Sequence, residues 1–165
     1  MERHDRERDQ VPSGPGARPR ALGEEEAGRI LSDRRFGVLA TLKRDGRPHM
    51  ASMVFAWDPD ERIIRIPSVA DRIKVRHLLR DPRATFQVEG ETVLSYAIAE
   101  GEAEVSEATA EPGDAVGREL LRLFGITDPA DEAEFFERMV RDRRVVIRLR
   151  VSRVYGTALD GPVAE

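Results

Sequence analysis

A cluster of basic side chains in the stretch 68–88 could hold an anion. The cluster consists of Arg72, Lys74, Arg76, Arg80 and Arg83, in a chain of 165 residues with a formal net charge of −4. A general nucleic-acid binder usually presents a whole basic domain that displaces counterions from phosphates. The acidic balance of this chain therefore predicts a local anion site and no nucleic-acid partner.

The spacing of the cluster divides it between two faces of a helix. With Asp71 as the N-cap and about 100° per residue, the arginines fall within roughly 80° of one another, and Lys74 points the other way. Arg80 and Arg83 then lie at the end of the helix where its dipole favours cations. Arg72 and Lys74 lie at the opposite end, where cations are unfavourable unless a bound anion joins them and the free backbone N–H groups. From spacing alone, a solvated basic helix and a phosphate site both remain open.

Side chains for metal or nucleophilic chemistry are sparse. The chain contains no cysteine, which excludes thiolate zinc sites and cysteine nucleophiles. His49 and His77 lie on different predicted elements without the spacing of a metal motif, so we expect no metal. His49 belongs to a predicted strand, where it could face either a ligand cleft or solvent.

The elements that must position these residues are mostly strands. Apolar periodicity, turn residues and prolines predict a first helix and three strands, a second helix and two strands, and two more helices before a final strand or strand pair. In order, their ranges are 23–36, then 36–69 for the three strands, 71–81, 83–90, 92–105, 112–125, 128–142 and 143–156. Such a run of antiparallel strands closes most easily as a small barrel, which removes exposed edges.

The composition predicts one domain between two tails. We expect a disordered tail over residues 1–22, a domain over 23–158 and a C-terminal tail over 159–165. The N-terminal stretch is charged and rich in proline and glycine, and it lacks the apolar segment of a secretory signal. No apolar run approaches the length of a membrane span. We therefore expect a cytoplasmic protein without a membrane partner.

Four stretches carry a family resemblance. They are "GVLATLKRDGRPHMASMVFAWD", "SVADRIKVRHLLRDPRATFQV", "LSYAIAEGEAEV" and "MVRDRRVVIRLRVSRVYG". In this order they resemble the pyridoxamine 5′-phosphate oxidase-like, FMN-binding split-barrel superfamily, and within it the actinobacterial branch that uses the deazaflavin coenzyme F-420. The resemblance implies a mainly β fold with flanking helices, a six-stranded antiparallel split β-barrel, and a homodimer with cofactor sites between its subunits.

The resemblance also implies which residues bind the cofactor. The phosphate is held at the end of the third strand and the start of the next helix, which here correspond to Ser68, Val69, Arg72 and Lys74. Two further pairs are expected beside the tricyclic ring: His49 and Ser52 from the same subunit, and Ser95 and Tyr96 from its partner. Several relatives have tryptophan where this sequence has Leu94, so one aromatic contact of the family is absent.

The activity implied by the resemblance is hydride transfer from reduced coenzyme F-420 to a conjugated small molecule. The cofactor carries that chemistry, so no catalytic side chain is expected from the protein. Two alternatives stay open. One is an FMN-dependent oxidoreductase of the same fold, and the other is a non-catalytic carrier of a cofactor, tetrapyrrole or lipid.

Overall fold

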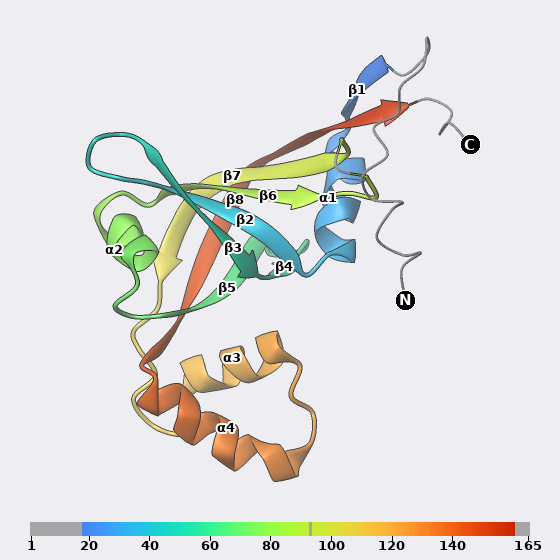
Figure 1. The fold of residues 1–165 in the computed structure, drawn as a ribbon. Helices are drawn as coiled ribbons and strands as arrows, with labels where there is room; N and C mark the ends of the chain where they lie inside the picture. Colours follow the sequence, from blue (N-terminus) through green and yellow to red (C-terminus); the bar gives the residue numbers. More distant parts are fainter. Residues whose placement is uncertain (1–17, 93, 161–165) are drawn as a thin grey trace, which may run out of the picture.

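Eight strands and four helices make up residues 18–92 and 94–160, the part of the chain that this computed structural model describes (Figure 1). In chain order the elements are β1 (Arg18–Leu22), α1 (Glu24–Asp33), β2 (Phe36–Leu42), β3 (Pro48–Val54), β4 (Ala56–Asp58), β5 (Ile63–Val69), α2 (Ile73–Arg80), β6 (Arg83–Glu89), β7 (Tyr96–Val105), α3 (Ala115–Phe124), α4 (Pro129–Arg141) and β8 (Arg144–Asp160). The four helices expected from the sequence are all present.

All strands belong to one antiparallel sheet that curls into an open barrel. Its order is β3-β2-β6-β7-β8-β5-β4, and β1 pairs with the end of β8. The two edge strands, β3 and β4, follow each other in the chain with only Phe55 between them. A sheet whose opposite edges are joined by one residue cannot lie flat. Phe55 is 1% exposed, its N–H donates to the Arg35 carbonyl at 3.0 Å, and its ring packs on Phe86 with centroids 4.8 Å apart.

The expectation of six strands is wrong, because the sheet has eight. The apolar stretch after Arg47 reads as one strand but is broken at Phe55, where the chain passes from one edge of the sheet to the other. The second additional strand comes from the N-terminal side: Arg18–Leu22 forms β1, although this stretch was expected in a disordered tail. Its residues are mostly exposed and show no apolar alternation, so only pairing with β8 reveals it. Residues 1–17 and 161–165 lie outside the described part of the chain.

Two apolar clusters hold the elements together. The larger one fills the barrel and includes Val75 and Leu78, through which α2 closes one end of it. The smaller one joins α3 and α4 to Val146 of β8, outside the barrel (Figure 1). None of the described helices is long and apolar enough to cross a membrane.

We predict that Phe55→Ala destabilises the protein by about 3–5 kcal/mol, because it removes a fully buried ring and leaves a cavity where the edges of the sheet meet. Leu79→Ala is the control, since Leu79 is a large apolar residue that is 69% exposed and should change stability by less than about 0.5 kcal/mol. Urea unfolding followed by tryptophan fluorescence measures both. Equal losses for the two variants would contradict the importance of this corner.

Candidate functional site

The end of β5 and the start of α2 bring four of the predicted cofactor residues together. Ser68 is the penultimate residue of β5, Val69 ends the strand, and Arg72 is the N-cap of α2. The turn between them is fixed by two backbone bonds, from the Arg72 N–H to the Val69 carbonyl at 3.1 Å and from the Ala70 N–H to a carbonyl of the α4–β8 turn at 3.0 Å. We call Ser68, Val69, Arg72 and Lys74 the cradle.

The hydroxyl of Ser68 is the feature of the cradle that a ligand would explain best. Ser68 is 4% exposed, and its Oγ has no hydrogen-bond partner among the described residues. Buried polar side chains normally have at least one partner, and the exceptions call for an explanation such as an absent ligand. A phosphate oxygen would supply the acceptor that this hydroxyl lacks.

The start of α2 is also prepared for an anion. No side chain caps this helix. The Val75 N–H donates to the Arg72 carbonyl at 3.0 Å, which leaves the N–H groups of Ile73 and Lys74 available to an anion. Lys74 is half-buried and forms no ion pair within the described residues. Burial and the nearby Arg72 charge both lower the pKa of Lys74. An anion bound beside the ammonium group would oppose both effects and favour the charged form. The sequence placed the N-cap at Asp71, whereas the structure has it at Arg72, one residue later.

The structure separates His49 from Ser52. Ser52 is exposed on the outer face of β3, next to Met50, which is 59% exposed. His49 points to the opposite face, where its ring meets His77 edge-on with centroids 5.3 Å apart. Because neighbouring side chains of a strand alternate between its faces, the two predicted ring contacts cannot both lie on one side of β3. Ser52 keeps the exposed position that a ligand would need.

Ser95 and Tyr96 lie far from the cradle within one chain. Tyr96 pairs with Thr157 near the end of β8, whereas Ser68 pairs with Val145 at its beginning. Ser95 closes the turn before β7, where its carbonyl accepts from the Gly90 N–H at 2.6 Å. The long β8 therefore holds the two groups at its opposite ends. They could meet only across an interface between two copies of the chain.

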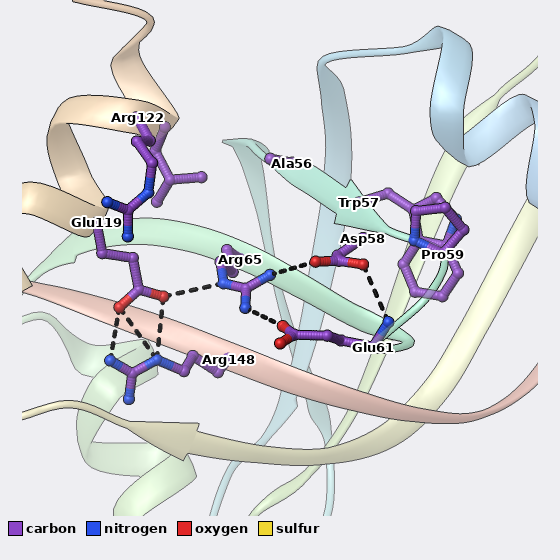
Figure 2. Close-up of a pocket in the computed structure, with 10 residues that line it drawn as sticks. Ala56, Trp57, Asp58, Pro59, Glu61, Arg65, Glu119, Arg122 and Arg148 are labelled. Atoms are coloured by element: carbon purple, nitrogen blue, oxygen red, sulfur yellow. Dashed lines mark hydrogen bonds and ion pairs between the residues drawn. The ribbon is translucent and has the colours of Figure 1, made fainter.

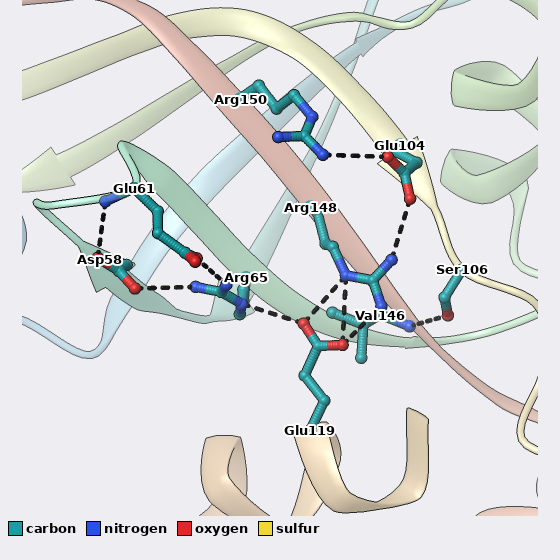
Figure 3. Close-up of polar contacts among 9 residues, drawn as sticks. All are labelled: Asp58, Glu61, Arg65, Glu104, Ser106, Glu119, Val146, Arg148 and Arg150. Atoms are coloured by element: carbon teal, nitrogen blue, oxygen red, sulfur yellow. Dashed lines mark hydrogen bonds and ion pairs between the residues drawn. The ribbon is translucent and has the colours of Figure 1, made fainter. Parts of the chain in front are cut away.

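A second polar centre, which the sequence reading missed, lies between α3 and the sheet (Figure 3). Glu119 of α3 is 9% exposed and accepts hydrogen bonds from Arg65 of β5 at 3.0 Å and from Arg148 of β8 at 2.6 Å. Arg65 also pairs with Asp58 at 3.4 Å and with Glu61, and Arg148 pairs with Glu104 at 3.1 Å. The only signal in the sequence was that Glu119, a charged residue, lies among the positions that α3 buries.

The electrostatics of this network keep Glu119 ionised. Burial by itself would raise the pKa of the Glu119 carboxyl, but the hydrogen bonds from Arg148 and the charges of Arg148 and Arg65 hold that pKa below its usual value. The network therefore anchors α3 to β5 and β8, the two strands that pair at Ser68.

An open cavity of about 580 Å³ adjoins the network (Figure 2). Trp57 and Pro59 line one side, and Arg65, Glu119 and Arg148 line the other. The charges of the two arginines are already balanced by carboxylates of the protein. Despite its volume, this cavity is therefore not a candidate ligand site, because its arginines are held in ion pairs that join α3 to the sheet. Among the described residues, no group of three or more His, Asp or Glu side chains is placed to hold a metal ion.

Comparison with known proteins identifies relatives over most of the chain. Residues 24–158 match the family described as pyridoxamine 5'-phosphate oxidase. The chain is 30% identical over 135 residues to a biliverdin reductase of Mycobacterium tuberculosis named as dependent on reduced F-420, covering 81% of this chain and 88% of that protein.

Solved structures agree with this assignment. An F-420 reductase is 26% identical with a TM-score of 0.57, and the match covers 81% of this chain and 96% of that one. An FMN-binding protein from Nostoc punctiforme, related to pyridoxamine 5'-phosphate oxidase, has a TM-score of 0.54 with 83% of this chain and 92% of that one covered. At 13% identity the latter shows only the shared fold.

We predict that Glu119→Gln costs about 3 kcal/mol of stability at neutral pH, because it leaves two half-buried arginines without their shared buried carboxylate. Glu61→Gln is the matched control: it removes an exposed partner of the same Arg65 and should cost less than about 1 kcal/mol. Because the pKa of Glu119 is lower in the folded state, its contribution is present above the ordinary value of 4.5 and is lost as the pH falls through the folded value. Urea unfolding at pH 7 and at acidic pH measures this. A difference between Glu119→Gln and wild type that does not shrink in acid would contradict the assignment.

Proposed function

Since the chain belongs to the pyridoxamine 5'-phosphate oxidase family, we propose that it is an oxidoreductase that binds the deazaflavin coenzyme F-420 and reduces a conjugated small molecule. The observation that supports this most directly is the buried Ser68 hydroxyl without a partner, at the entrance of α2. A phosphate fits there, because it offers acceptors to the hydroxyl and to the free N–H groups and balances the charge of Lys74.

Each residue of the cradle has a binding role in this proposal. Ser68 donates its hydroxyl proton to a phosphate oxygen, and the first N–H groups of α2 donate to the others. Arg72 is exposed at the N-cap and Lys74 is half-buried behind it, so the two bring positive charge from the solvent side and from the protein side. Charge-assisted bonds of this kind are about twice as strong as neutral ones.

The coenzyme supplies the hydride from its own ring when it is bound, and the protein binds and orients it. Met50 and Ser52 offer a surface for that ring on the outer face of β3, one apolar and one polar. Phe36 of β2 is exposed on the same face, because its cross-strand partner Val54 lies on the same face of β3 as Met50 and Ser52. An exposed apolar surface on two neighbouring strands is typical of a binding or association surface.

The acceptor is proposed from chemistry and from a relative. A hydride acceptor needs a conjugated, electron-poor carbon, and the relative from Mycobacterium tuberculosis is named for the reduction of biliverdin, a linear tetrapyrrole. We propose a linear tetrapyrrole as the first acceptor to test. FMN remains the alternative cofactor, because it carries the same kind of phosphate for the cradle.

We also propose a homodimer. Ser95 and Tyr96 lie at the opposite end of β8 from the cradle, so they can reach a bound ring only from a second copy. The exposed Phe36 and Met50 lie on the face that such a copy would cover.

We predict that Lys74→Ala and Arg72→Ala each weaken coenzyme F-420 binding at least tenfold, or about 1.4 kcal/mol. Arg141→Ala is the control, because Arg141 is an exposed arginine on α4 and its removal changes the net charge equally. Titration of the apoprotein with coenzyme F-420, and separately with FMN, followed by ligand fluorescence, measures the affinities and decides between the cofactors. Unchanged affinity in both cradle variants would overturn the phosphate site.

Light scattering at micromolar concentration should give twice the mass of the chain. Met50→Glu should reduce this mass to that of a monomer, because it places a charge on an apolar contact surface. A wild-type monomer would remove Ser95 and Tyr96 from the site.

A further inference from the structure

A second cationic site lies on the other side of α2, between this helix and the turn that joins β2 to β3. The cavity there has a volume of about 420 Å³. Its lining includes the cationic side chains Lys43, Arg44, Arg76 and Arg80 and the imidazoles of His49 and His77. We call it the hairpin pocket. Its lining residues, all within the described part of the chain, include no carboxylate.

Three of the four positive charges of the hairpin pocket have no ion-pair partner among the described residues. Lys43, Arg44 and Arg76 form no ion pair with any described residue, unlike Arg65 and Arg148 beside the larger cavity. The fourth cation, Arg80, donates to the carbonyl of Leu42 and so ties the end of α2 to β2. Like charges held around one cavity repel each other unless an anion lies among them.

The floor of the pocket contains a buried polar atom without a partner. Nδ1 of His49 is buried and has no hydrogen bond within the described residues, although His77 beside it is paired through Nδ1 with the Thr41 hydroxyl at 2.9 Å. His77 is 5% exposed. Its pKa is lowered by burial first, and then by the neighbouring His49 and by the cations Arg80, Lys43 and Arg76. An anion in the cavity would offset those cations and favour protonation of this imidazole.

The hairpin pocket is distinct from the cradle. At about 100° per residue, Lys74 points roughly 160° away from Arg76, so the two side chains leave α2 on nearly opposite sides. Arg76 and Arg80 are one turn apart and both line the hairpin pocket, whereas neither Lys74 nor Ser68 belongs to its lining. The basic helix therefore presents cations on two sides, at the cradle and at the hairpin pocket.

We propose that the hairpin pocket is a second anion site, which binds a ligand segment carrying two or more carboxylates or phosphates. Four cations around one cavity match a multivalent anion better than a single charge. The guanidinium groups can hold carboxylate or phosphate oxygens two at a time. This inference rests on the charges and the cavity, and it does not require the cofactor assignment to be correct.

The test is calorimetric titration of the apoprotein with citrate and with inorganic tripolyphosphate at low ionic strength. Both should bind, and Lys43→Ala and Arg76→Ala should each weaken them at least tenfold. Arg141→Ala, which removes one exposed arginine elsewhere, should change the affinity less than twofold. Arg76→Lys should restore part of the affinity, because it keeps the charge without the paired N–H donors, and this separates charge from folding. Equal affinity in Arg76→Ala and Arg141→Ala, or no binding at all, would overturn the proposal.

Two further measurements sharpen the result. Binding of citrate should raise the pKa of His77 measured by proton NMR, and an unchanged titration of His77 would contradict occupation of the pocket. Lys74→Ala should leave the affinity for citrate unchanged, while it weakens the binding of coenzyme F-420. Failure of the cofactor proposal and failure of this inference thus give different outcomes.

Competition identifies the source of the anionic groups. Displacement of citrate by coenzyme F-420 would assign the pocket to the carboxylates of the coenzyme side chain. Displacement by biliverdin alone would assign it to the carboxylates of the acceptor. Either result supports an anion site whose natural ligand is part of the reaction.

Discussion

The closure of the sheet at Phe55 is the constraint on which the rest of the structure depends. Because this one residue joins the two edge strands, β3 and β4, the sheet must curl, and its inner face becomes the main apolar core. The curl leaves an open end next to the last residues of β5. That end is closed by α2, whose Val75 and Leu78 enter the core. The cradle exists where this closing helix begins, so the position of its basic residues follows from how the barrel is sealed.

The basic residues of α2 lie on different sides of the helix. Arg76 and Arg80 line the hairpin pocket beside the β2–β3 turn, whereas Lys74 leaves α2 on the opposite side and does not line it. A single amphipathic helix can do this because its buried face is narrow, which leaves two flanks for polar chemistry. Arg83, expected just beyond the end of the helix, is the first residue of β6 and pairs with Asp81 at 2.7 Å. The structure therefore divides the basic cluster between the two proposed anion sites and one local ion pair.

The network around Glu119 serves a different purpose from these sites. It lies on the outside of the barrel and fixes α3 on β5 and β8, where a buried carboxylate is tolerated only because two guanidinium groups satisfy it. Arg65 is three residues before Ser68 on β5, so the network anchors the strand that ends in the cradle to α3. Ion pairs stabilise the Glu119 network, whereas apolar packing stabilises the barrel.

Sequence by itself determined the local elements, the basic face of α2, and through four motifs the family. These depend on periodicity, turn residues and spacing within short segments. The break at Phe55, the pairing of Arg18–Leu22 with β8, and the Glu119 network were decided only by tertiary structure, since each joins residues far apart in the chain. The same holds for the contact between His49 and His77. Spacing could place a cation on a helix face, but only the packed barrel showed which cavity that face lines.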